Sequence, residues 1–153
     1  MSLDTITNVA EIIIALAAVF GIFFNIKQQR TMMKQIKTEV FIRYCSKYPM
    51  NKEVSNVVKY LEEIEGLNHN STVANPDGHD VEIFMRFFEE IEYHIRAKIM
   101  DEQMVYDMFS YYLFVFEKNK EKFNITDYDS DSWSYYRNIV KRLENIKRKR
   151  EKK

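Results

Sequence analysis

The strongest hydrophobic pattern in the chain lies near its N-terminus. Residues 12–24 carry no polar side chain, and the apolar run extends over residues 6–26 with four interruptions, Thr7, Asn8, Glu11 and Asn25. A helix over residues 6–26 would be about 31 Å long at 1.5 Å per residue, which matches the ~30 Å hydrocarbon core of a bilayer. The pattern therefore predicts a membrane anchor at residues 1–30 that contacts the lipid bilayer through residues 6–26.

The charges on either side of this run predict its orientation. Residues 1–11 contain two acidic and no basic side chains, unlike the basic start of a secretory signal peptide. The first basic side chains follow the run, and these are Lys27, Arg30, Lys34 and Lys37. By the positive-inside rule, we expect a single pass of the inner membrane, with the N-terminus outside and the rest in the cytoplasm. The alternative left open is a soluble oligomeric bundle in which this first helix is buried.

Apolar side chains at three- and four-residue spacing predict further helices after the anchor. The first helix is expected to run on until Pro49 ends it, because proline disfavours helix at the preceding residue. A second helix is predicted over residues 51–65 and a third from about residue 81. Asp101 is a candidate N-cap for a fourth helix that ends near Asn119, and Asp131 for a fifth. The predicted fold is all-α: a transmembrane helix that continues into a cytoplasmic four- or five-helix bundle.

Three of these helices carry predicted core faces. The face of the third helix contains Val81, Phe84, Met85, Phe88, Ile91 and Ile95. The segment "MFSYYLFVF", residues 108–116, is apolar on nearly every side and is predicted to be the central helix of the bundle. The last helix is predicted to bury Trp133, Tyr136, Ile139, Val140, Leu143 and Ile146. These faces define a cytoplasmic domain at residues 31–146, followed by a basic tail at 147–153 that we expect to fray.

Composition supports long helices with few connections. The chain has 3 glycines and 2 prolines, whereas its 11 phenylalanines and 10 tyrosines provide material for a core. A single cysteine, Cys45, excludes an internal disulfide. The Gly-x-Ser-x-Gly, phosphate-loop and dinucleotide motifs are absent from the sequence, and so is the Glu-x-x-His spacing of di-iron bundles. We therefore predict no catalytic residue, no metal site and no cofactor.

Charge is distributed unevenly along a chain whose net charge is zero. Residues 51–138 carry nine basic and eighteen acidic side chains, whereas residues 139–153 carry eight and two. The acidic body argues against nucleic-acid binding. The basic residues at the end are candidates for contact with anionic lipid, together with those that follow the apolar run; the end residues are Lys147, Arg148, Lys149 and Arg150.

One polar side chain falls on the apolar side of the third helix. Glu92 lies between the core positions, and Arg96 follows four residues later, where it can pair with Glu92. Arg86 and Glu89 lie on the charged side of the same helix. Two interpretations stay open for Glu92: a carboxylate at the edge of an interface with a partner on its own helix, or a polar contact to another helix or a ligand. Glu92, Arg96, Arg86 and Glu89 form the predicted polar interaction site.

The order of motifs from Phe84 to Phe116 resembles a family of small bacterial membrane proteins of unknown function. The matching residues are Phe87-Phe88-Glu89 in "FMRFFEEIEYHI" and Asp101-Glu102 in "MDEQMVYDMF", with Trp133 and Arg137 further on. The glycine usual before the Asp-Glu pair is replaced here by Lys98-Ile99-Met100. The resemblance implies one N-terminal span and a cytoplasmic helical domain in a bacterial or phage-related protein.

The function expected from these patterns is a membrane-anchored interaction module with a protein partner or self-association, in bacterial defence or stress. A helical enzyme acting at the membrane surface is the alternative.

Overall fold

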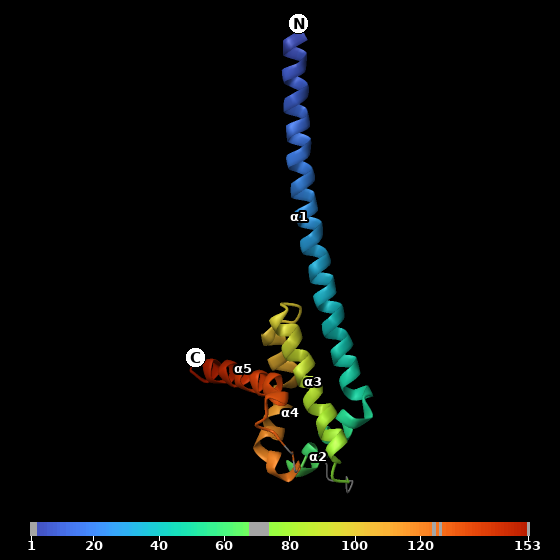
Figure 1. The fold of residues 1–153 in the computed structure, drawn as a ribbon, viewed down its shortest axis with the longest axis vertical. Helices are drawn as coiled ribbons and strands as arrows, with labels where there is room; N and C mark the ends of the chain where they lie inside the picture. The colour runs from blue at the N-terminus through green and yellow to red at the C-terminus, as the bar shows by residue number, and fades with distance from the viewer. Residues whose placement is uncertain (1–2, 68–73, 124, 126, 153) are drawn as a thin grey trace. The chain divides into compact units, whose positions relative to one another are not determined.

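The computed structural model of the protein is all-helical in the residues that it describes, which are 3–67, 74–123, 125 and 127–152 (Figure 1). In the first helix, the side chains of residues 3–13, 15 and 49 lie outside the description. The α-helices are α1 (Leu3–Met50), α2 (Lys52–Ile64), α3 (Gly78–Arg96), α4 (Glu102–Asn119) and α5 (Ser134–Glu151). Two short 3-10 helices, η1 (Lys120–Phe123) and η2 (Asp131–Trp133), lie between α4 and α5. The all-α prediction is confirmed.

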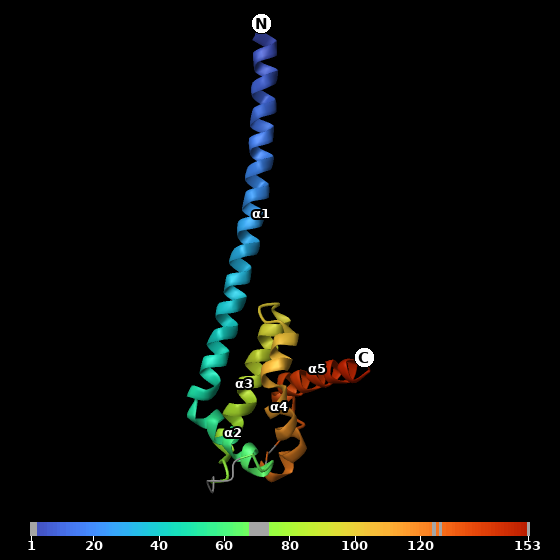
Figure 2. The same cartoon turned by 180° about the vertical axis from the view of Figure 1, so that it is seen from behind.

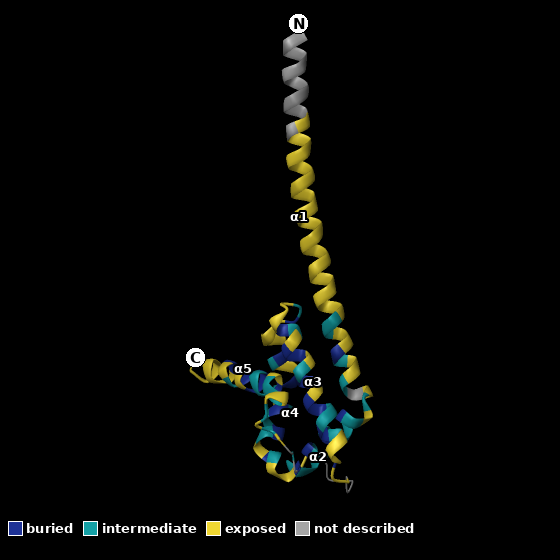
Figure 3. Cartoon of the chain, in the orientation of Figure 1, coloured by how far each residue is buried: buried dark blue, intermediate teal, exposed yellow. Residues whose placement is uncertain are grey.

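The chain divides into two compact units, Met1–Glu39 and Val40–Lys153. The first unit is the N-terminal part of α1. The apolar side chains described in it are exposed (Figure 3), and they include Ile14, Leu16, Val19, Phe20, Ile22, Phe23, Phe24 and Ile26. In the described part of the chain, no helix is long and apolar enough to cross a membrane. The side chains of residues 6–13, which belong to the predicted span, lie outside the description.

The core of the second unit forms around the apolar face of α3. All six residues predicted for this face are buried, and Phe87 is buried with them. The Phe84 ring lies 4.9 Å from that of Phe116 on α4, and the Phe88 ring lies 6.4 Å from that of Tyr136 on α5. In both views α5 runs across the direction of α3 and α4 (Figures 1 and 2), so its buried face closes the core over both helices.

Side-chain caps fix where three of these helices begin. The Asn51 side chain accepts a hydrogen bond from the Val54 backbone N–H at 2.8 Å, and the Asp101 carboxylate accepts two from the first turn of α4. The predicted starts of α2 and α4 are therefore confirmed. Helix α3 begins at Gly78, three residues before the predicted start, because Asp77 caps it by accepting from the Asp80 N–H.

Helix α1 continues past the proline that was expected to end it. The helix ends at Met50, and the Asn51 N–H still donates to the Lys47 carbonyl at 2.9 Å. Proline removes its own N–H donor and disfavours helix at the preceding residue, yet Tyr48, Pro49 and Met50 are all helical. The prediction that Pro49 ends the helix is therefore wrong.

The last helix differs from its prediction at both ends. Asp131 begins η2 rather than capping α5, whose first residue is Ser134 and which has no side-chain cap. Trp133 is only partly buried, whereas the other five residues predicted for the buried face are buried. The predicted fraying is also wrong, since α5 stays helical through Glu151. The Arg150 guanidinium reaches Asp107 on α4 at 2.7 Å and holds this end against the bundle.

Helix α4 is buried on one side only, whereas its sequence predicted the central helix of the bundle. Met108 is 52% exposed, and Met104 and Tyr111 share its exposed side. The opposite side of α4 is buried through Val105, Phe109, Leu113 and Phe116. Packing against α2 and α5, and against the Phe84 and Phe87 rings of α3, covers this side, so a segment that is apolar all round presents one apolar face to solvent.

The turn between α3 and α4 contains a residue in the left-handed region. Lys98 has φ 58°, and the Ile99 N–H donates to the His94 carbonyl to close the end of α3. Glycine adopts this conformation without steric cost, whereas other residues lose roughly 1 kcal/mol. The glycine that the sequence resemblance expects in this segment would therefore suit the backbone at Lys98.

Candidate functional site

The most unusual polar group in the described structure is the Glu92 carboxylate. Its residue is 0% exposed, on the buried face of α3. Arg96, one turn later, donates from Nε to Glu92 Oε1 at 2.8 Å. Arg142 of α5 donates from Nε to Oε2 at 3.0 Å and from Nη2 to Oε1 at 3.1 Å. Two guanidinium groups therefore neutralise one buried carboxylate through three hydrogen bonds.

Arg142 links Glu92 to a third helix. Its Nη1 donates to Glu102 Oε2, at the start of α4, at 3.1 Å. The hydrogen bonding of Arg142 to Glu92 is the largest reason that the pKa of Arg142 is raised above its ordinary value, and burial opposes it. Arg96 is held from its other side, because its guanidinium lies 4.7 Å from the ring centre of Tyr135. Helices α3, α4 and α5 thus meet at one fixed charge cluster.

The structure brings together half of the predicted polar site. The spacing of four residues correctly pairs Glu92 with Arg96. Arg86 lies elsewhere, with Nη2 2.7 Å from Glu82 Oε1 and its guanidinium 5.7 Å from the Trp133 ring. Glu89 is partly buried, and desolvation raises the pKa of its carboxyl group against the lowering effects of the Tyr136 backbone and of Arg86. Neither Arg86 nor Glu89 contacts Glu92.

Sequence reasoning missed Arg142 and Glu102. Arg142 lies 50 residues from Glu92 along the chain, so helical spacing cannot connect the two. The available signal was that Arg142 lies among the predicted buried positions of α5, two residues after Val140 and one before Leu143. A cationic side chain in that place is suited to pair with the one acidic group on the apolar face of α3.

An open cleft surrounds this cluster, and we call it the basic cleft. One side is formed by Glu92 and Arg96 of α3 with Glu102 of α4. The other side is formed by α5, through Asn138, Lys141, Arg142, Asn145 and Lys149. The cleft has a volume of about 380 Å³, within the ~300–1,000 Å³ range of small-molecule sites.

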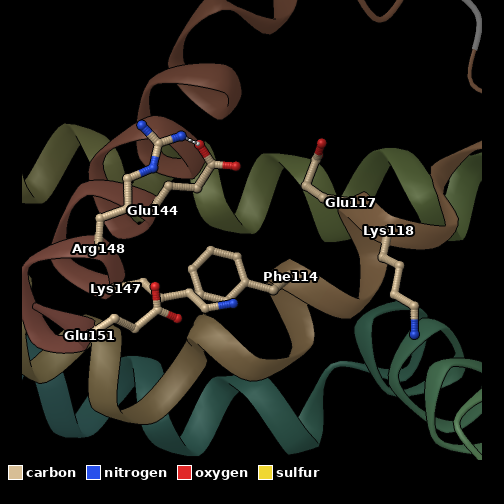
Figure 4. Close-up of a pocket in the computed structure, with 7 residues that line it drawn as sticks. All are labelled: Phe114, Glu117, Lys118, Glu144, Lys147, Arg148 and Glu151. Atoms are coloured by element: carbon tan, nitrogen blue, oxygen red, sulfur yellow. Dashed lines mark ion pairs between the residues drawn. The ribbon is translucent and has the colours of Figure 1, made fainter.

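A second open cleft, of about 500 Å³, lies on another side of α5 (Figure 4). Three carboxylates and three cationic groups line it, together with Phe114. Arg148 pairs with Glu144 at 3.7 Å, as the dashed line shows, and the Lys147 ammonium lies 5.3 Å from the centre of the Phe114 ring. We call it the balanced cleft, because its opposite charges are equal in number.

The basic residues at the end of α5 do not form a single patch. Lys147 and Arg148 line the balanced cleft, Lys149 lines the basic cleft, and Arg150 pairs with Asp107. An α-helix places successive residues about 100° apart, so the side chains of consecutive basic residues point in different directions around the helix axis. The four basic residues after the apolar run, at 27, 30, 34 and 37, are exposed on α1.

Tyrosine hydroxyls paired with glutamates join the helices at three further places. Tyr44 donates to Glu90 Oε2 at 2.9 Å and lies 3.1 Å from His94 Nε2. Tyr112 donates to Glu62, and Glu117 accepts from both Tyr128 and Tyr136. Burial, followed by the interaction with Glu90, raises the pKa of Tyr44. These pairs fasten helices together, and the described residues contain no group of three or more His, Cys, Asp or Glu side chains that could hold a metal ion.

The Tyr112–Glu62 pair predicts a loss of stability at high pH. Burial, and then the hydrogen bond to Glu62, raise the pKa of Tyr112 from 10.0 to about 12. When the pKa of a group is higher in the folded than in the unfolded protein, the group contributes its full stabilisation at pH values below the unfolded-state pKa. This contribution is lost as the pH rises through the folded-state pKa. We expect the stability advantage of the wild type over Tyr112→Phe to shrink between about pH 9 and 12. Urea unfolding of both proteins across this range measures the difference, and a difference that stays constant would contradict the assignment.

Comparison with known proteins adds no relative: the chain matches no family model, no curated protein and no solved structure.

Proposed function

We propose that the protein is a membrane-anchored helical binding module, held in a bilayer through residues 6–26, whose second unit presents a charged site. The observation that carries the proposal is the uncovered apolar surface of α1. Phe20 and Phe23 are each 73% exposed, and six further large apolar side chains between residues 14 and 26 are 45–69% exposed. Apolar surface of this extent marks contact with lipid or with another protein.

Lipid is the occupant that fits the distribution of these side chains. Positions 19, 20, 22, 23 and 24 point in different directions around a helix that turns about 100° per residue. A partner helix covers one stripe of its neighbour, whereas lipid surrounds the whole circumference. Together with residues 6–13, of which Thr7, Asn8 and Glu11 are polar, the run reaches the ~20 residues that a bilayer requires.

The charged residues support one orientation. The exposed Lys27, Arg30, Lys34 and Lys37 follow the apolar run directly, where they can meet anionic headgroups. Basic residues are retained on the cytoplasmic side, so the second unit is assigned to the cytoplasm and the N-terminus to the outside. Binding of a partner or ligand is then the role of the second unit, at the cluster around Glu92.

Charging the apolar run should release the protein from membranes. We expect the wild-type full chain to stay with bacterial membranes after alkaline carbonate extraction. The double variant Leu16→Arg/Val19→Arg should appear in the supernatant, because each arginine near the centre of the span costs about 2.5–3.5 kcal/mol of insertion energy. Quantitative immunoblots of the pellet and supernatant measure the partition.

A matched control adds the same charge just outside the run. Gln28→Arg/Gln29→Arg should remain in the membrane pellet, because the new charges lie at the headgroup level. Wild-type protein in the supernatant would overturn the anchor and favour the oligomeric bundle with α1 at its centre. An alkaline phosphatase fused to the C-terminus that is active in the periplasm would overturn the orientation.

A further inference from the structure

The basic cleft has an excess of positive charge that the protein itself does not use. Its lining contains four cationic groups and two carboxylates. Both carboxylates are already paired, since Glu92 accepts from Arg96 and Arg142, and Glu102 accepts from Arg142. Lys141 and Lys149 are exposed and have no ion-pair partner among the residues that the structure describes. The unneutralised charge of the cleft therefore belongs to these two lysines.

The spacing of the hydrogen-bond donors on α5 indicates an elongated binding site. Lys141, Asn145 and Lys149 are each four residues apart on α5, so they form one row along the helix. The row is about 12 Å long at 1.5 Å per residue, with the Asn145 amide midway between the two ammonium groups. Arg96 faces the row from α3 and uses Nε for Glu92, which leaves its terminal nitrogens for a ligand. A compact anion would engage one end of the row, whereas a chain of linked anionic groups would engage the whole of it.

The walls of the cleft are rigid enough to act as a binding site. Arg142 lies between the two sides and is fixed by three donations to Glu92 and Glu102, one from each of its nitrogens. The Glu92 carboxylate to which it is bound is fully buried. Because Arg142 and Glu92 are already ordered, only the exposed side chains of the row have to become ordered when an anion binds.

We propose that the basic cleft binds a small soluble ligand that carries two or three linked phosphate groups. Charge-assisted hydrogen bonds from ammonium, guanidinium and amide donors are the interactions that phosphate oxygens favour. The cleft volume of about 380 Å³ can hold a diphosphate group together with the body of a small molecule. The inference names the ligand class for the binding role proposed for the second unit and does not depend on the anchor.

The surroundings favour a small ligand over a long polyanion. Residues 51–138 carry twice as many acidic as basic side chains, and Asp107 lies near the end of α5 through its pair with Arg150. The acidic side chains of this segment repel a long polyanion, which extends beyond the cleft, more than a ligand that stays inside it. A ligand that fits inside the cleft contacts mainly the basic row.

Isothermal titration of the full chain in a detergent with an uncharged headgroup tests the proposal, with inorganic pyrophosphate and tripolyphosphate as probes at low salt. We expect saturable binding of both probes and weaker binding of monophosphate. Lys141→Gln/Lys149→Gln should weaken pyrophosphate binding at least about tenfold, because both free cations of the row are lost. Melting curves of the same samples should stay unchanged, since both side chains are exposed.

The matched control removes the same charge from the balanced cleft. Lys147→Gln/Arg148→Gln should bind pyrophosphate within about a factor of two of wild type, because only long-range attraction is reduced. An equal loss in both double variants, or no binding of either polyphosphate, would overturn the proposal. Binding only to vesicles that contain phosphatidic acid would also overturn it, since the phosphates would then come from a lipid surface. Membrane fractionation is a separate measurement, so failure of the anchor leaves this result standing.

Discussion

Replacing Arg142 with methionine should destabilise the protein by about 3 kcal/mol. The substitution removes two of the three hydrogen bonds to the buried Glu92 carboxylate and the hydrogen bond that joins this cluster to Glu102. Removing one partner of a buried ion pair costs about 3–5 kcal/mol, because an uncompensated charge is left behind. The lower end applies here, since Arg96 stays paired with Glu92. Urea unfolding of the full chain, followed by helical circular dichroism, gives the free energy of unfolding.

A second variant separates the lost pair from the lost packing. In Glu92→Met/Arg142→Met both charges are absent, so no uncompensated carboxylate remains in the core. Buried pairs replaced by apolar side chains of similar size are often neutral in stability, and we expect the double variant to be more stable than Arg142→Met alone. If the double variant is less stable than the single one, the charge of Glu92 is not the source of the effect.

Phe88→Ala should cost about 3–5 kcal/mol. Phe88 is fully buried, and its ring centre lies 5.1 Å from that of Phe84, 5.4 Å from that of Phe87 and 6.4 Å from that of Tyr136. Truncation to alanine leaves a cavity between α3 and α5, and the neighbouring rings, held by the backbones of these two helices, cannot all move into it. The same urea titration measures the loss.

An exposed aromatic residue on the same helix provides the comparison. Tyr93 is 60% exposed, and Tyr93→Ala should change stability by no more than about 0.5 kcal/mol. Similar losses for the two variants would mean that the buried face of α3 has been assigned incorrectly. A loss below about 1 kcal/mol for Phe88→Ala would mean that the surrounding core can collapse into the space.

The helices and their starting points are features that the sequence determines locally. A cap such as Asp101 acts on the next two or three backbone N–H groups, and the face of α3 follows from a repeat of 3.6 residues. The ion pair between Glu92 and Arg96 was predicted correctly for the same reason, because the two residues are only four positions apart on one helix. Local spacing does not account for the end of α5, where Arg150 pairs with Asp107 on another helix. The error at the end of α1 is a local one, because the Asn51 N–H still donates to the Lys47 carbonyl four residues earlier.

The candidate site was decided by the tertiary structure. Glu92 acquires Arg142 and Glu102 only when α5 and the start of α4 are placed against α3. The basic residues at the end of the chain are consecutive in the sequence, yet the helix places their side chains in two clefts and in an ion pair with Asp107. Sequence alone determines which side chains are apolar, charged or able to cap, because these properties belong to single residues and short spacings. Which charges meet and which stay free depends on how helices far apart in the sequence pack, and no local spacing records that.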